Sequence, residues 1–264
     1  MATPSTDTLL SLENIELAFN GVKAVSAITF ALARGEICAL IGPNGAGKSS
    51  LLNVISGVYV PQRGRITFEG QPVERMRPRE AARRGIARTF QNIALFKGMS
   101  ALDNVMTGSH LARQGGFWDD LARTPRAARE ERAARERAEE ILALLHIQHH
   151  RATPVGQLPY GLQKRVELGR ALAARPKLLL LDEPMAGMTH EEKAEMAHFV
   201  REAHEHLGAT VLLIEHDIGI VMSLSSHVVV LDYGRKIADG APHEVSAHPD
   251  VIAAYLGRAH AEAA

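Results

Sequence analysis

The chain has 264 residues, 46% of them hydrophobic, which is enough for one large domain, or a core with a subdomain, around a sizeable apolar interior. Thirty Lys and Arg residues balance thirty Asp and Glu residues, which argues against a strongly basic nucleic-acid-binding surface, so we expect no nucleic-acid partner. The single cysteine, Cys38, excludes a disulfide within the chain. No run of about 18 apolar residues occurs, so a partner would have to supply any membrane span.

The N-terminal part of the chain predicts a small antiparallel sheet. Apolar and polar residues alternate over residues 10–19 and 25–32, and the Asn20-Gly21 pair between them is typical of a hairpin turn. Residues 65–68 are a plausible third strand. A short basic helix is expected over residues 78–84.

Residues 36–41 are predicted to form a short apolar strand. The segment that follows them indicates a nucleoside-triphosphate site. Its sequence fits G-x-x-x-x-G-K-[ST], and helical spacing resumes over Lys48–Ile55. In this motif backbone N–H groups and a helix N-terminus surround the phosphates, the lysine reaches the outer phosphates and the hydroxyl binds Mg²⁺. The candidate nucleotide-binding residues are Gly42, Pro43, Asn44, Gly45, Ala46, Gly47, Lys48, Ser49 and Ser50, with Ser49 as a metal ligand.

The C-terminal half alternates strands with helices. Apolar strands are expected at residues 178–181, 210–214 and 228–231, with helices over 191–206, 218–224 and 250–256. Continuous apolar strands interleaved with helices favour a mostly parallel sheet covered on both faces, and hence an α/β fold. The region from about residue 98 to 145 is instead helical and highly charged, with mixed signs typical of a solvated helix face.

Chemically useful side chains follow the strands of this sheet. Asp182 and Glu183 end one buried strand and His216 follows the next, so all three are expected at the carboxyl edge where ligands bind. We predict that Asp182 binds Mg²⁺, that Glu183 polarises the attacking water, and that His216 senses the γ-phosphate. The amide of Gln91 is suited to contacting both the metal and the water.

The phosphate loop alone leaves kinases, GTPases, helicases and transport ATPases open, but the ordered set of motifs resembles the nucleotide-binding subunits of ABC transporters. The resemblance spans roughly residues 9–256. It implies a Walker A loop at 42–49, a Q-loop at Gln91, a signature motif at 158–163, a Walker B strand at 178–183 and a switch histidine at His216.

The resemblance also implies an ATPase with ATP and Mg²⁺ as its ligands, formed by residues 1–264 as a single ABC domain. Residues 98–175 would be a helical subdomain holding the signature, and Phe19 would stack on adenine or be a core residue at a strand end. Two subunits, alike or different, would bind two ATP molecules between the phosphate loop of one and Gly161 of the other.

Three positions depart from the family pattern. Pro159 and Tyr160 replace a serine and a glycine of the signature, and Pro159 offers the γ-phosphate neither a hydroxyl nor an N–H. Thr189 stands where many relatives have aspartate. We therefore expect Gly161 to keep its role, while contacts between subunits through Pro159 and Thr189 would change.

The L-P-Y-G signature and the ending H-P-D-V-I-A-A-Y-L-G resemble the LivG-type ATPases of branched-chain or hydrophobic amino acid importers. This implies integral membrane permeases, a second ATPase subunit, a periplasmic binding protein, and a peripheral location on the cytoplasmic face of a bacterial inner membrane. The alternatives are the ATPase of another transporter, for lipopolysaccharide export or for urea or amide uptake, and a soluble ABC ATPase that serves no transporter.

Overall fold

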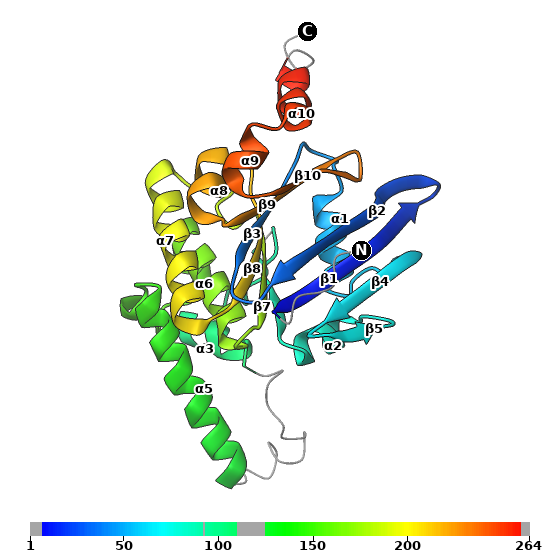
Figure 1. Ribbon diagram of the computed structural model, residues 1–264. Coiled ribbons are helices and arrows are strands. Elements are labelled where there is room, and N and C mark those ends of the chain that lie inside the picture. Colours follow the sequence, from blue (N-terminus) through cyan, green and yellow to red (C-terminus); the bar gives the residue numbers. More distant parts are fainter. Residues whose placement is uncertain (1–6, 92, 110–124, 260–264) are drawn as a thin grey trace.

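Two β-sheets and their helices make up the computed structural model, which describes residues 7–91, 93–109 and 125–259, with side chains up to residue 255. The larger sheet runs through the middle of the molecule (Figure 1). The smaller sheet and α1 (Lys48–Ile55) lie on one side of the larger sheet, and most of the other helices lie on its opposite side. This arrangement confirms the predicted α/β class.

The smaller sheet is antiparallel, as predicted. Its strand order is β2-β1-β4-β5. Its strands are β1 (Thr8–Phe19), β2 (Val22–Ala33), β4 (Arg63–Phe68) and β5 (Gln71–Val73). The first two are joined by the expected turn, in which both Asn20 and Gly21 have positive φ. The three-residue strand β5 has no alternating pattern in the sequence and was not predicted.

The larger sheet has the order β10-β9-β3-β8-β7-β6 and is parallel except for its edge strand β10. Its strands are β3 (Ile37–Ile41), β6 (Ile86–Arg88), β7 (Leu178–Asp182), β8 (Thr210–Ile214), β9 (His227–Asp232) and β10 (Arg235–Gly240). Every residue of β3, β7 and β8 is buried, which is why these strands are apolar throughout. The edge strands β6 and β10 are short or polar, and the sequence did not predict them.

The helices expected over residues 48–55, 78–84, 191–206, 218–224 and 250–256 are confirmed, whereas no bounds were predicted for those at Tyr160–Ala173 and Pro242–Ser246. The described helices are α1, α2 (Pro78–Arg83), α3 (Ala101–Thr107), α5 (Pro125–Leu144), α6 (Tyr160–Ala173), α7 (His190–Leu207), α8 (Ile218–Leu224), α9 (Pro242–Ser246) and α10 (Pro249–Ala259), with short 3₁₀ turns at Gln148–His150 and Val155–Gln157. Part of the predicted helical region, residues 110–124, lies outside the described residues. No helix in the described ranges is long and apolar enough to cross a membrane.

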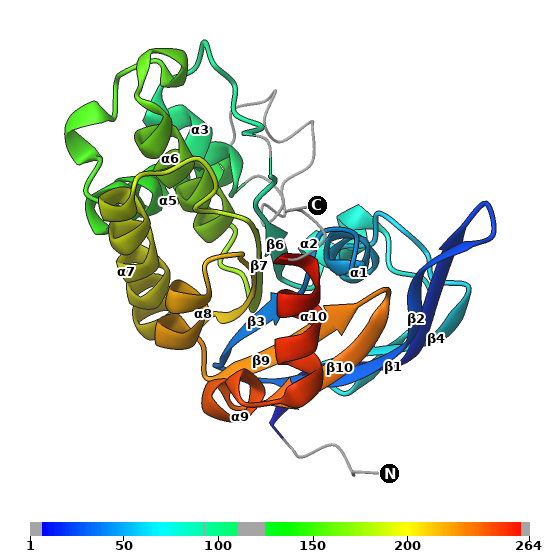
Figure 2. The same ribbon diagram turned by 90° about the horizontal axis from the view of Figure 1, so that it is seen from above.

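The core has separate clusters on the two faces of the larger sheet. Alternate residues of β3 point to opposite faces, so Cys38 and Leu40 pack with α1 and the smaller sheet. Ile37 joins the cluster formed with α3, α5, α6 and α7, whereas Ala39 and Ile41 pack with residues of α8, α9 and α10. Viewed from above, α10 lies over the same end of the sheet as α1 (Figure 2). The segment that connects the end of β3 to α1 lies at this end of the larger sheet.

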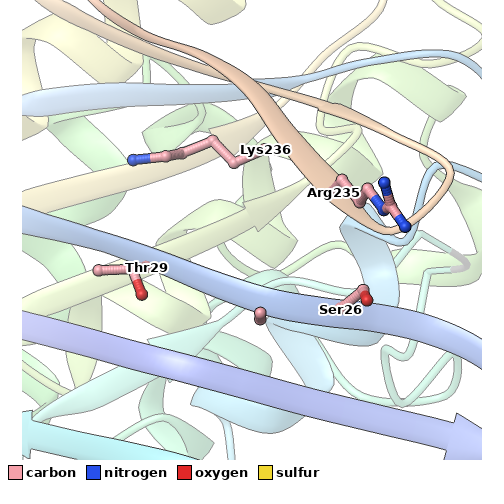
Figure 3. A pocket seen from close by; sticks show the side chains of 5 residues that line it. Ser26, Thr29, Arg235 and Lys236 are labelled. Atoms are coloured by element: carbon pink, nitrogen blue, oxygen red, sulfur yellow. The ribbon is translucent and has the colours of Figure 1, made fainter.

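The two sheets meet where β10 packs beside β2. A surface hollow of about 430 Å³ lies between them, with Arg235 and Lys236 of β10 on one side and Ser26 and Thr29 of β2 on the other (Figure 3). The contact is reinforced by a hydrogen bond from the Ser26 N–H to the carbonyl of Gly234, 2.7 Å. The C-terminal hairpin is thereby held against the antiparallel sheet.

Candidate functional site

The phosphate loop connects β3 to α1 in the predicted strand-loop-helix order. Gly42 and Gly47 have φ of 147° and 99°, in the region that favours glycine. A Cβ at Gly42 would overlap the carbonyl oxygen of Leu231, and one at Gly47 would overlap that of Ala24. Gly45 also has positive φ, but a Cβ there would meet open space. Close backbone packing, and not only ligand access, therefore requires glycine at Gly42 and Gly47.

Lys48 is the first residue of α1 and is only 6% exposed. Its Nζ donates to the carbonyl oxygens of Gly42 at 2.5 Å and Pro43 at 3.0 Å, so this buried cation lies over the loop. The helix has no acidic residue in its first turn to offset the positive potential of its N-terminus. Ser49 and Ser50 follow within that turn, so the predicted anion-binding residues form one contiguous site.

Glu183 is the centre of the predicted catalytic group. It follows β7 with a φ of 49°, which is uncommon for a residue other than glycine. Its Oε2 accepts a hydrogen bond from Gln91 Nε2 at 3.2 Å, and its Oε1 lies 2.7 Å from His216 Nε2. The structure thus brings together three side chains from separate loops. The parallel sheet predicted this for Glu183 and His216, and Gln91 joins them from the segment after β6.

Asp182, at the end of β7, is 3% exposed. Its Oδ2 accepts a hydrogen bond from Arg88 at 2.7 Å, whereas its Oδ1 is buried and has no hydrogen-bond partner. An unpaired buried carboxylate oxygen suits a hard cation such as Mg²⁺, which prefers oxygen ligands and takes one or two carboxylates together with phosphate oxygens. The residues present therefore fit the predicted metal. Among the described residues no cluster of three or more His, Cys, Asp or Glu forms an alternative metal site.

Glu215 was not predicted as a site residue, and it joins two of the loops that carry the predicted catalytic residues. This carboxyl group is 5% exposed, and it accepts hydrogen bonds from the N–H of Met185 at 2.9 Å and that of His216 at 3.2 Å. Burial raises the pKa of Glu215, while the two backbone hydrogen bonds oppose that change. The loop after Glu183 and the loop bearing His216 are thus fastened to one side chain.

Helix α6, which begins with the signature, holds the Gln91 segment through charged side chains. Lys164 Nζ donates to the Gln91 carbonyl at 3.2 Å, and Glu167 accepts from the Phe90 N–H at 3.4 Å. Arg170 donates to the Ala94 carbonyl at 2.5 Å. These residues were missed because charged side chains on a helix normally face solvent, although their three-residue spacing does place them on one face.

Of the three residues that depart from the family pattern, Pro159 and Tyr160 lie in the predicted signature and Thr189 begins α7. Tyr160 donates its hydroxyl to the carbonyl of Ala186, 3.2 Å away, in the loop that follows Glu183. Thr189 caps α7 in a capping box with Glu192. A Cβ at Gly161 would meet the carboxylate of Glu192, so Gly161 lies against α7. Pro159 is the N-cap of α6 and forms no side-chain cap, and its role between subunits stays a prediction.

Phe19, the predicted adenine contact, ends β1 and is 42% exposed. Its ring lies edge-on to Tyr59 with centroids 5.0 Å apart. The neighbouring Ala18 is held by two hydrogen bonds to the amide of Gln62, at 2.8 and 2.9 Å. An exposed aromatic ring on a fixed backbone agrees with stacking, and its role stays a prediction.

Tyr255 of α10 is a further contact that the sequence did not reveal. Burial raises the pKa of Tyr255, and an interaction of its hydroxyl with the backbone of Gly42 opposes that rise. The C-terminal helix thus touches the first glycine of the phosphate loop, more than two hundred positions earlier in the chain.

An apolar groove of about 930 Å³ runs beside the Gln91 segment. Phe90 and Phe96, which line it, are 44% and 56% exposed. Val58, Ala81 and Ala171 add to its apolar lining. Exposed apolar side chains gathered in a groove are typical of a binding surface for another protein.

Comparisons with known proteins agree with this geometry. Residues 25–186 match a family described as "ABC transporter", and residues 235–261 match "Branched-chain amino acid ATP-binding cassette transporter". The chain is 37% identical over 251 residues to the high-affinity branched-chain amino acid transport ATP-binding proteins BraF of Pseudomonas aeruginosa and LivG of Escherichia coli K12, covering 95% of this chain and 98% of each relative.

Solved structures give the same result. The ADP conformation of MJ1267, an ATP-binding cassette of an ABC transporter, superposes with a TM-score of 0.82 at 33% identity, covering 95% of this chain and 99% of that one. A nucleotide-free ATP-binding cassette from an ABC transporter superposes with a TM-score of 0.81 at 32% identity, covering 94% and 98%.

Proposed function

Because the chain belongs to the ABC transporter family of ATP-binding subunits, we propose that it hydrolyses ATP to drive uptake of branched-chain amino acids. The substrate class rests on the match of residues 235–261 and on the identity to BraF and LivG. The observation that best supports the hydrolytic site is Glu183, which is hydrogen-bonded to both Gln91 and His216 beside a phosphate loop.

In this proposal the phosphate loop binds the triphosphate of ATP. The backbone N–H groups of residues 42–47 and the N-terminus of α1 face the phosphates, and Lys48 moves from the loop carbonyls to the outer phosphates. Phe19 stacks on the adenine. Because the loop N–H groups and the N-terminus of α1 are held in place by the fold, they stabilise developing charge without reorganisation.

Ser49, Gln91 and the free Oδ1 of Asp182 would hold Mg²⁺. When bound, the ion would neutralise charge on the β- and γ-phosphates. Glu183 then orients the attacking water, while Gln91 and His216 keep its carboxylate in place. His216 also lies where its ring can contact the γ-phosphate.

We further propose that residues 1–264 form one ABC domain, with the helical region of about 98–175 as its subdomain. Gly161 would complete the ATP site of a second subunit, which is either another copy or a related ATPase. The exposed N-terminus of α6 supports this, because Pro159 and Tyr160 leave it without a side-chain cap.

ABC ATPase subunits work with membrane permeases, and the apolar groove beside Gln91 is our candidate for the permease contact. A permease helix placed there would cover Phe90 and Phe96 and lie next to the catalytic amide. This docking would hold the chain on the cytoplasmic face of the inner membrane, while a periplasmic binding protein delivers the amino acid to the permeases.

Two substitutions test the site. Glu183→Gln should keep ATP binding but lower ATP turnover by roughly 10²- to 10⁴-fold, the usual range for a positioned acid-base group. Lys48→Ala should weaken ATP binding itself. Purified variants would be compared by nucleotide-binding titration and phosphate release, and parent-like turnover in Glu183→Gln would refute the assigned role.

The substrate is tested separately by reconstitution into proteoliposomes with the permeases and binding protein encoded alongside. Leucine-stimulated ATP hydrolysis is expected. Stimulation by urea, an amide or lipopolysaccharide instead would assign the chain to another transporter, and co-purification with ribosomes or DNA would favour a soluble ABC ATPase.

A further inference from the structure

Arg88 lies at the end of β6, where its side chain is 11% exposed. Its guanidinium makes three hydrogen bonds: to Asp182 Oδ2 at 2.7 Å, to Asn53 Oδ1 at 2.5 Å and to Ser56 Oγ at 3.1 Å. Asn53 belongs to α1, and Ser56 is its C-cap. One side chain therefore connects the strand that ends in Asp182 to the helix that begins with Lys48.

The bonding of Asp182 is unequal. Oδ2 is occupied by the guanidinium, and Oδ1 is buried without a partner. A planar guanidinium that is itself anchored at two other points restrains the carboxylate in direction as well as in position. Without that anchor the carboxylate would be free to rotate, and its unpaired oxygen would no longer be held in one place.

We infer that Arg88 is a positioning residue, which aims Oδ1 of Asp182 at the Mg²⁺ of the nucleotide site and fixes its distance from α1. This inference rests on the proposed function, because it assigns Asp182 to the metal. It is separate from the roles of Lys48 and the loop glycines, which bind phosphate. Loss of Arg88 should therefore weaken the enhancement of nucleotide binding by Mg²⁺ much more than it weakens nucleotide binding without metal.

The test uses the full chain and a fluorescent, non-hydrolysable ATP analogue, titrated first in EDTA and then with increasing Mg²⁺. Arg88→Met removes the charge but keeps the length of the stem. We expect its metal-free affinity to stay within about twofold of the parent and the Mg²⁺ concentration for half-maximal enhancement to rise about tenfold. Arg88→Lys, which restores a charge but not the fork, should recover part of that loss.

Arg165→Met is the matched control. Arg165 is similarly buried, with 13% of its side chain exposed, and is also paired with a carboxylate, that of Glu195. Its pairing partner lies on α7, away from Asp182. Its Mg²⁺ titration should equal that of the parent.

The outcomes separate the inference from the proposed function. If the parent shows no Mg²⁺-dependent binding of the analogue, the proposed function fails. If the parent is normal and Arg88→Met has the same Mg²⁺ midpoint, or loses affinity equally with and without metal, the inference is wrong. Should Arg88→Met not fold, Asn53→Ala decides, because it removes one anchor and should raise the midpoint about threefold; an unchanged midpoint overturns the inference.

Discussion

Replacing Lys164 by methionine should destabilise the protein substantially, because it leaves the buried carboxylate of Glu167 without its ion-pair partner. Lys164 and Glu167 are each 2% exposed, with Nζ and Oε2 3.6 Å apart. Both also bind the backbone of the Gln91 segment. Methionine matches the length of the lysine stem, so the change removes the charge and its hydrogen bonds with little change in packing.

The expected size follows from these distances and burials. Two unit charges at this separation attract by about 4–5 kcal/mol at an effective dielectric constant of about 20, and desolvation opposes much of that gain. Removing only one member of a buried pair leaves the desolvation cost of the other charge without the Coulombic attraction that offsets it. The free energy of unfolding should then fall by about 3–5 kcal/mol. For a chain of this size the midpoint of thermal unfolding should fall by roughly 6–20 °C.

The loss should also depend on pH. Burial already raises the pKa of Glu167, and the charge of Lys164 opposes that rise, so the pKa should increase further in Lys164→Met. When the pKa of a carboxyl is higher in the folded state, its contribution to the free energy of unfolding is largest below the unfolded pKa, here 4.5. That contribution is lost as pH rises through the folded pKa. The substitution should therefore lower the free energy of unfolding less at pH 5.5 than at pH 8.

Urea unfolding followed by circular dichroism at both pH values measures these free energies. Lys164→Met combined with Glu167→Gln is the control, because it removes both charges and should recover most of the loss at pH 8. A single-variant cost below about 1 kcal/mol, or a double variant that simply adds two losses, would show that the pair is not buried as described.

Two further predictions concern the sheet and its loop. Gly42→Ala should cost about 3 kcal/mol or more by urea unfolding, because its Cβ meets the Leu231 carbonyl, whereas Gly45→Ala should cost only about 1–2 kcal/mol for its positive φ; equal costs would contradict the role assigned to packing. The pKa of His227 is raised to about 12, chiefly by its hydrogen bond to Asp239. The protonated His227 therefore stabilises the folded state fully below its unfolded pKa of 6.5, and this stabilisation is lost as pH rises through about 12. The free energy of unfolding of the parent should therefore fall more steeply between pH 7 and 9 than that of His227→Gln, and parallel curves would exclude this pairing.

The sequence alone predicted the parts of the fold that depend on neighbouring residues. The phosphate loop is set by a strand, glycines and a helix start within some fifteen positions, all local properties. The buried strands β3, β7 and β8 were recognisable because a strand covered on both faces must be apolar throughout. Their parallel order also explains why Asp182, Glu183 and His216 were expected at one edge, whereas the strand β6 that brings Gln91 there was not predicted.

Tertiary structure decided the contacts between distant segments. Arg88 and Asp182 are 94 positions apart, and nothing in either segment distinguishes a buried, paired arginine from a solvated one. The sequence likewise gave no sign that charges of α6 are buried, and only the packing of the Gln91 segment made Lys164 and Glu167 internal. Burial and pairing of a charge depend on which segments fold against it, so periodicity along the chain can locate a helix or strand but cannot name its partners.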